Sequence, residues 1–202
     1  MERRTVEHAT LIQALWPASG PNVLLRGALS VLAGAILLTA SAKLKVPFYP
    51  VPMTMQTFVV LVLGAAYGAR LGTGTVLTYL ALGAVGLPVF ADTPERGLGF
   101  AYMVGPTGGF LVGFAAAAFA VGALAERGWD RSITWLFLAM AVGHVVLFAF
   151  GVTWLAALIG WTKAWALGVA PFYLATVLKT ALATATIAGL GSVAAKLRSP
   201  ML

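Results

Sequence analysis

Long apolar runs separated by short polar stretches dominate the pattern of residues along this chain. A helix needs about 20 mostly apolar residues to cross a bilayer, and six runs reach or approach that length. The second run is the shortest, and only a few residues around Arg70 separate it from the third. The pattern therefore predicts six membrane-spanning helices, over residues 23–42, 54–69, 71–90, 107–125, 133–151 and 171–195.

Two flanking stretches complete the predicted organisation. Residues 152–168 are apolar and rich in Trp, which favours the membrane–water interface, so they either extend the fifth helix or form an interfacial segment. Residues 1–22 mix charged and apolar positions and form an N-terminal cytoplasmic or interfacial segment, either a short surface helix before Pro17 or a disordered tail. Residues 23–197 form the predicted six-helix membrane domain.

Composition agrees with this pattern. The 202 residues are 60% hydrophobic and 9% charged, with a mean hydropathy of +0.94, whereas a soluble domain has about 25% charged residues. The fold class is therefore all-α: a polytopic membrane protein built as a six-transmembrane-helix bundle. The absence of cysteine excludes disulfides, thiol catalysis and metal–thiolate sites. The net charge of +7 comes from basic residues dispersed at the ends of apolar runs, which indicates topology signals rather than nucleic-acid binding.

The distribution of basic residues predicts the orientation, because cytoplasmic segments carry an excess of Lys and Arg. One predicted side holds eight such residues and the other holds four, which places both termini on the cytoplasmic side of the membrane. The first set is Arg3, Arg4, Arg26, Arg70, Arg127, Arg131, Lys196 and Arg198; the second is Lys43, Lys45, Arg96 and Lys163.

Lys179 is the one charge within the last apolar run. A lysine at membrane depth is costly unless it is paired, hydrated or deprotonated. The chain has no acidic residue after Asp130, and the other predicted spans contain none. Lys179 is either an uncharged or hydrated lysine, or it meets an anion on a bound molecule. The second interpretation predicts an intramembrane site for a small ligand with a carboxylate or phosphate, about 12 Å from the outer end of the helix.

Histidine offers no comparable site. His144 lies in the fifth predicted span, where a neutral ring bonded to a backbone carbonyl is the expected arrangement. His8 is the only other histidine, so no metal cluster is predicted.

The loop after the first span reads KLKVPFYPVPMTMQ and ends at Gln56. Its three prolines exclude a helix and favour an extended chain, and Thr54 is a reasonable N-cap for the second helix. The loop is either a stiff turn or a lid whose large apolar side chains, such as Phe48, close over a pocket. Gln56 begins an apolar helix and either bonds to neighbouring helices or presents its amide to a ligand.

The segment over residues 86–114 concentrates glycine, aromatic and hydroxyl groups. Within it, GPTGG at residues 105–109 predicts a helix start whose backbone N–H groups can approach a polar partner. Tyr102 and Thr107 add hydroxyls beside this start. The Lys and Ser/Thr that complete a phosphate-binding loop are missing, so nucleotide binding is excluded here.

Taken together, these residues resemble those of a known family. The strings VPFYPVPMTMQT, GLPVFA and YMVGPTGGF, and a Pro171-Phe172 pair followed by Lys179, are similar to the BioY family, the biotin-specific S components of energy-coupling factor (ECF) transporters. The resemblance extends over residues 26–188.

The resemblance implies an outward-facing biotin pocket with the loop after the first helix as its lid. It implies biotin uptake without enzymatic activity or a cofactor. The implied partners are a membrane T component and a pair of cytoplasmic ATPases, while solitary or homo-oligomeric action is also possible. Together with the polar and aromatic positions above, it gives the candidate binding residues Phe48, Gln56, Tyr79, Phe90, Tyr102, Gly105, Thr107, Gly108, Thr176 and Lys179.

The chain departs from the family at two places. Members usually carry an Asp three residues before the final lysine, where this chain has Thr176. The first helix lacks a strict Ala-x-x-x-Ala pair for docking on the T component and offers Ser30/Gly34 and Ala35/Thr39 instead. Lys179 would meet the biotin carboxylate or, with Thr176, another polar edge of the ligand.

Two other classes remain open at this point. The chain could be a non-catalytic assembly subunit whose lysine pairs with a carboxylate of another protein. It could also be an intramembrane enzyme, although it has no H-E-x-x-H motif, no paired carboxylates within a span and no cysteine.

Overall fold

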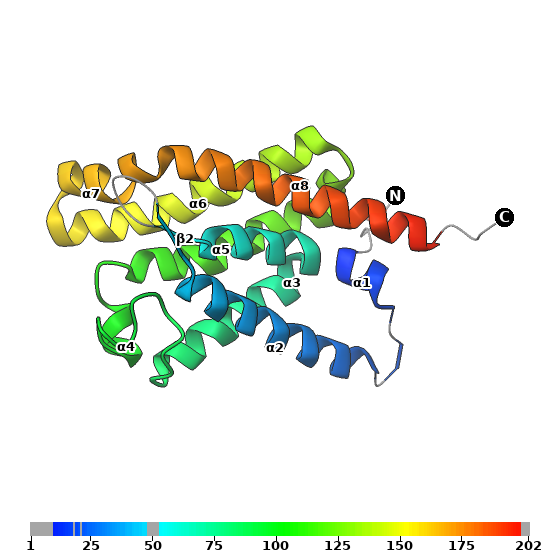
Figure 1. Cartoon of the computed structure of the whole chain (residues 1–202), viewed down its shortest axis with the longest axis horizontal. Helices are drawn as coiled ribbons and strands as arrows, with labels where there is room; N and C mark the ends of the chain where they lie inside the picture. Colours follow the sequence, from blue (N-terminus) through cyan, green and yellow to red (C-terminus); the bar gives the residue numbers. More distant parts are fainter. Residues whose placement is uncertain (1–9, 18, 21, 48–52, 199–202) are drawn as a thin grey trace, which may run out of the picture.

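The computed structural model describes residues 10–17, 19–20, 22–47 and 53–198. Within these ranges, five helical stretches are long and apolar enough to cross a membrane. They contain the long helices of a single bundle (Figure 1), namely α2 (Asn22–Lys43), α3 (Gln56–Ala84), α5 (Gly108–Glu126), α6 (Ile133–Ile159) and α8 (Tyr173–Arg198). The predicted all-α membrane fold is confirmed.

Helix α3 contains two of the predicted spans, because it folds back at Gly68. This residue has φ 83° and ψ 176°, a conformation that glycine adopts without strain. A Cβ built on Gly72 would lie 3.1 Å from the Cα of Gly64, whereas residues eight positions apart in a straight helix are separated by about 12 Å. The second and third predicted spans are therefore two arms, residues 56–67 and 69–84, that lie side by side.

Helix α5 holds this bend in place. The carboxylate of Glu126 accepts a hydrogen bond from the backbone N–H of Ala69, with an Oε1–N distance of 2.9 Å. Gly122 also lies against the backbone of Gly68 and Ala69, so closely that a Cβ there would collide with both. The end of α5 thus satisfies a backbone N–H group that has no helical partner at the bend, and it holds the bend in position.

Shorter elements occupy the ends of the bundle. The described ends of the loop after α2 are two short strands that pair antiparallel as a hairpin, with Lys45 opposite Thr54 and Val46 opposite Met53, and these ends are extended as the sequence predicts. The short elements are α1 (Leu11–Leu15), β1 (Lys45–Val46), β2 (Met53–Thr54), α4 (Gly99–Met103), η1 (Trp129–Arg131), α7 (Trp161–Gly168) and η2 (Ala170–Phe172). Of the two possibilities for residues 1–22, the structure shows a short helix over Leu11–Leu15.

Several predicted boundaries were wrong. Helix α6 runs eight residues beyond position 151, and α7 follows it as a separate helix, so residues 152–168 divide between the two alternatives. The third predicted span ends at Ala84 rather than at position 90, because the chain turns at Gly86 with φ 98°. Thr54 lies in β2 and Met55 occupies the N-cap position of α3, so the capping role predicted for Thr54 is also wrong.

Close helix contacts fall at glycines, as the four-residue spacing of small residues predicts. A Cβ on Gly64 would lie 2.7 Å from the carbonyl oxygen of Ala118, where α3 crosses α5. A Cβ on Gly113 would lie 2.8 Å from the carbonyl oxygen of Leu147, where α5 crosses α6. The three central helices therefore pack backbone to backbone.

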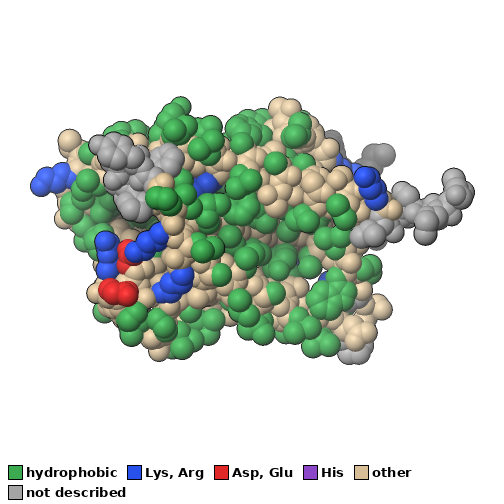
Figure 2. All heavy atoms as spheres, in the orientation of Figure 1, with side chains coloured by type: hydrophobic (Ala, Val, Ile, Leu, Met, Phe, Trp, Pro, Cys, Tyr) green, Lys and Arg blue, Asp and Glu red, His purple; other side chains and the backbone are tan. Residues whose placement is uncertain are grey.

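The elements sort to two ends of the bundle. The hairpin, α4, α7 and the start of α8 lie at one end, on the left in Figure 1, and α1 and the end of α8 lie at the other. Helix α1 packs on α3 and α8 there. Hydrophobic side chains cover much of the face shown in Figure 2, with charged ones gathered mainly toward the ends. This distribution fits a bundle surrounded by lipid.

Candidate ligand-binding site

A cavity opens at the hairpin end of the bundle. Its volume of about 670 Å³ is within the range of roughly 300–1,000 Å³ typical of small-molecule sites. The hairpin, the start of α3, the loop over residues 91–96, the start of α5, the end of α6 and the start of α8 all contribute to its wall. The cavity therefore lies where the chain passes from helix to loop.

Aromatic and aliphatic side chains form much of the cavity wall. They suit a flat apolar ring system, because moving the apolar surface of such a ring out of water is favourable. The contributing residues from α5, α6, α7 and η2 are Phe110, Leu111, Phe114, Leu147, Phe148, Leu155, Ile159, Leu167 and Phe172.

Lys179 lies at the buried side of this cavity and is 7% exposed. Its Nζ donates to the backbone carbonyl of Thr54 at 2.7 Å and to the hydroxyl of Thr57 at 3.3 Å. Among the described residues no carboxylate forms an ion pair with it. The ammonium group is therefore held by neutral acceptors, and its third donor is available for a ligand.

Gln56 presents a fixed amide beside Lys179. Its Nε2 donates to the hydroxyl of Tyr79 at 2.8 Å, and that hydroxyl donates to the carbonyl of Val89 at 3.1 Å. The hydroxyl of Thr54 donates to its Oε1 at 3.3 Å. Tyr79 is fully buried. A chain of hydrogen bonds from the second arm of α3 thus orients a polar group that lines the cavity.

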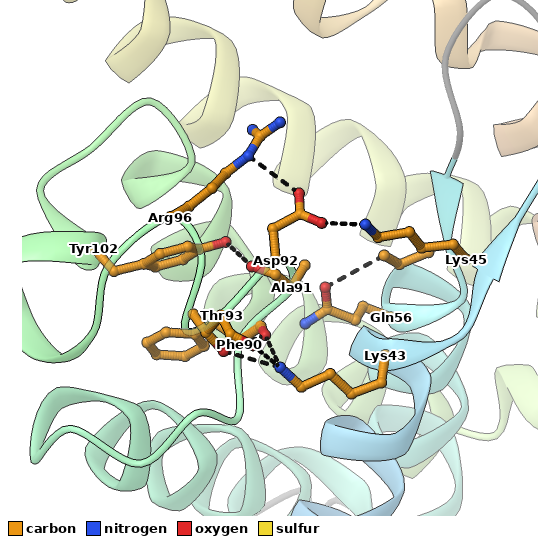
Figure 3. Close-up of polar contacts among 10 residues, drawn as sticks. Lys43, Lys45, Gln56, Phe90, Ala91, Asp92, Thr93, Arg96 and Tyr102 are labelled. Atoms are coloured by element: carbon orange, nitrogen blue, oxygen red, sulfur yellow. Dashed lines mark hydrogen bonds and ion pairs between the residues drawn. The ribbon is translucent and has the colours of Figure 1, made fainter.

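Three charged side chains meet at the exposed mouth of the cavity. Figure 3 shows Lys45 and Arg96 reaching the two carboxylate oxygens of Asp92 from opposite sides. Lys45 contacts Oδ1, and the Nε of Arg96 lies 3.4 Å from Oδ2. The hydrogen bond from Lys45 lowers the pKa of Asp92. This cluster ties β1 to the loop that follows α3.

A second lysine also connects the end of α2 to the loop that follows α3. The Nζ of Lys43 donates to the carbonyls of Phe90 and Thr93, at 2.9 and 2.7 Å, and to the Thr93 hydroxyl at 3.0 Å. Lys43 thereby satisfies backbone carbonyls of a turn that has left the helix. This positions the segment that carries Asp92.

Three packed aromatic side chains support the loop that carries Asp92. The ring of Phe90 lies between Tyr79, at 5.4 Å edge-on, and Tyr102, at 5.1 Å stacked. The hydroxyl of Tyr102 donates to the carbonyl of Ala91 at 2.9 Å, and burial raises the pKa of this tyrosine. These side chains connect α3 to α4 next to this loop.

The predicted binding residues divide into three groups. Those that line the cavity are Gln56, Tyr102, Thr107, Thr176 and Lys179. Four residues lie directly behind the wall: Tyr79, Phe90, Gly105 and Gly108. The carbonyl of Gly105 accepts a hydrogen bond from the indole of Trp154 at 2.9 Å, and Gly108 lies in the first turn of α5. Phe48 lies outside the described residues.

Sequence reasoning missed the charged cluster at the mouth. Lys45 and Arg96 were interpreted as topology signals, and Asp92 was not singled out. The spacing of Asp92 and Arg96, four residues apart beside a proline, was the available signal. Their meeting with Lys45 depends on a contact across 47 residues of chain. No group of three or more His, Cys, Asp or Glu side chains within the described residues could hold a metal ion.

The fold and cavity define a polytopic helical membrane protein with a largely apolar cavity, lined by a few polar and charged side chains, inside its bundle. The chain belongs to the BioY family, whose family model matches residues 13–196. This membership confirms the resemblance found in the sequence and the expectation that the chain is a transport component and not an enzyme.

Several relatives are described as biotin transporters. One from Pyrococcus horikoshii, called a probable biotin transporter BioY, is 39% identical over 155 residues, which is 76% of this chain and 90% of that protein. The biotin transporter BioY of Rhizobium etli is 44% identical over 126 residues, 58% of this chain and 66% of that protein. A solved structure of the S-component for biotin from an ECF-type ABC transporter matches with a TM-score of 0.70 and 21% identity, over 87% of this chain and 95% of that one. It shows the same fold.

Proposed function

We propose that this protein binds biotin in the cavity and is the substrate-binding S component of an ECF-type transporter that takes biotin up. The observation that carries the proposal is an apolar, aromatic cavity with polar groups at two depths, in a chain whose relatives are described as biotin transporters. Biotin matches this arrangement, because it joins a ureido group and an apolar fused ring to a carboxylate tail.

The ring would lie against the aromatic and aliphatic part of the cavity wall. The polar edge of the ligand would be met by Gln56, Thr107, Thr176 and Lys179, which line the wall. Tyr79 and Phe90 would act behind them, by fixing the amide of Gln56 and the loop at the mouth. Each polar contact in such a site discriminates strongly, since a buried group left without a partner costs about 1–3 kcal/mol.

The proposed location is the cytoplasmic membrane of a bacterium, with the cavity facing outward and both termini in the cytoplasm. The described part of the chain supports this orientation, because the segments predicted to be cytoplasmic contain the basic residues Arg26, Arg70, Arg127, Arg131 and Lys196. Helix α1 and the end of α8 lie at that opposite end. The strands of the β1–β2 hairpin contribute Lys45, Met53 and Thr54 to the wall, which supports a covering role for the loop after α2.

The proposed partners are a membrane T component and a pair of cytoplasmic ATPases. This chain has no nucleotide-binding motif, so energy from ATP would have to come from such proteins. The solved structure with the same fold is described as part of an ECF-type ABC transporter. Uptake by the protein alone, or by a homo-oligomer, is the alternative that a reconstitution with and without partners would reveal.

The test is calorimetry of the detergent-purified, full-length protein with biotin, with desthiobiotin and thiamine as comparison ligands. Saturable binding of biotin and no binding of thiamine would support the proposal. A well-folded protein that binds none of the three would overturn it. Stable capture of a partner protein without any small-molecule binding would favour an assembly subunit instead.

A further inference from the structure

The charged groups that line the cavity are separated by depth. Among the described residues, these are Lys45, Asp92 and Arg96 at the mouth and Lys179 inside. The side chains of Lys45 and Arg96 are 60% and 72% exposed, and that of Asp92 is 26% exposed, whereas Lys179 is 7% exposed. A ligand that extends through the cavity would therefore meet a hydrated charged site at one end and a dry one at the other.

The two cations at the mouth have donors to spare. Asp92 engages one N–H of Lys45 and the Nε of Arg96, and no other acceptor within the described part of the chain contacts either side chain. An ammonium carries three donors and a guanidinium five. Two cations around one carboxylate also leave one net positive charge at this point.

We propose that Lys45 and Arg96 form a subsite for the carboxylate of the ligand, and that Asp92 is the internal counter-ion that matches this subsite to a single negative charge. This inference rests on the proposed function, and it assigns the two ends of the ligand. The carboxylate lies at the mouth, and the neutral polar group lies at Lys179 and Gln56.

The cost of dehydration supports this orientation. Moving a carboxylate into a dry interior carries a large desolvation penalty even when a cation is present, while a neutral urea-like group loses less. Lys179 already donates to Thr54 and Thr57, both neutral acceptors, so its surroundings suit another neutral acceptor. At the exposed mouth the carboxylate keeps part of its water.

Asp92 sets the charge of the subsite. With it, a monocarboxylate meets one excess positive charge, and a dianion meets repulsion from the Asp92 carboxylate. Three further ionisable groups lie nearby. The ammonium of Lys43 is engaged by Phe90 and Thr93, Glu95 is exposed and does not line the cavity, and the neutral Tyr102 hydroxyl donates to Ala91.

The experiment compares biotin with its neutral carboxamide on the purified full-length protein. Lys45→Met and Arg96→Gln are each expected to lower the preference for biotin over the carboxamide about fivefold, the size of one exposed charge pair. Asp92→Asn is expected to raise that preference by a similar factor. Lys163→Met removes an exposed charge from α7, outside the cavity lining, and is the matched control with an unchanged preference.

The ratio of the two affinities separates ligand contact from structural support. A loss of affinity that is equal for biotin and the carboxamide in Lys45→Met and Arg96→Gln would overturn the subsite, because it would mean that these residues only hold the hairpin. A change of preference in Lys179→Met instead would move the carboxylate to Lys179 and also overturn it. Failure of the folded wild-type protein to bind biotin would overturn the proposed function itself.

Discussion

The Nζ of Lys179 lies 2.7 Å from the backbone carbonyl oxygen of Thr54, a residue 125 positions earlier in the chain. The contact joins the last helix of the bundle to the end of the β1–β2 hairpin, directly at the cavity wall. A single buried ammonium group thus both connects two distant segments and keeps one donor for a ligand.

Replacing Lys179 with Met should weaken biotin binding by about thirtyfold, because a hydrogen bond from a charged donor contributes about 2 kcal/mol. Calorimetry measures the change, and Lys196→Met at the opposite end of α8 should leave the affinity unchanged. Equal affinities in the two variants would remove Lys179 from the binding site.

Replacing Tyr79 with Phe should lower both stability and biotin affinity. The substitution removes the hydroxyl that accepts from Gln56 and donates to Val89, and leaves two buried groups without partners, at about 1–3 kcal/mol. Tyr173→Phe is the matched control, since Tyr173 is 73% exposed. The midpoint of thermal unfolding, followed by tryptophan fluorescence, and calorimetry measure the two effects. An unchanged midpoint in Tyr79→Phe would contradict the role of this hydrogen-bond chain.

Replacing Gly113 with Val should destabilise the bundle by about 2 kcal/mol, because the new side chain would force α5 away from the Leu147 backbone. Gly189→Ala in α8 is the control, since a Cβ there meets no atom within 4 Å. The free energy of unfolding in a denaturing detergent series gives the comparison. Similar values for both variants would show that the crossing of α5 and α6 can widen freely.

The ion pair of Asp92 should make part of the stability depend on pH. Lys45 lowers the pKa of Asp92 below its ordinary value of 3.8, so the paired carboxylate stabilises the fold at pH values above that ordinary value. The contribution is lost as the pH falls through the lowered pKa. The difference in unfolding midpoint between the wild type and Asp92→Asn should therefore be constant near neutral pH and shrink in acid. A difference that grows in acid would contradict the direction of the shift.

Local patterns predicted the helices but not the contacts that build the cavity. The apolar runs located α2, α5 and α8 within a few residues, because span length depends on composition alone. The Gly68 bend was missed by about two residues, since Arg70 rather than the glycine was taken as the boundary. The pairing of Lys45 with Asp92 and of Lys179 with Thr54 could not be predicted, because each joins segments that only the folded bundle brings together.

The chemical interpretation of Lys179 shows the same limit. Its isolation from acidic residues was visible in the sequence and led to the prediction of a binding site, but the sequence could not show that a backbone carbonyl is its partner. Taken alone, Gln56 favoured a structural role over a ligand-facing one, and the structure gives it both positions: its amide is fixed by Tyr79 while it lines the cavity.

The bend at Gly68 bears on how this chain fits the bilayer thickness. The two arms of α3 have lengths of about 18 and 24 Å at 1.5 Å per residue, and both are shorter than a hydrocarbon core of about 30 Å. The bilayer must therefore thin around α3, or other parts of the protein must cover the ends of the arms. The turn lies beside Arg70, at the end of the bundle predicted to be cytoplasmic, and the Glu126 carboxylate satisfies the N–H of Ala69, one of the backbone groups that lose their helical partner there.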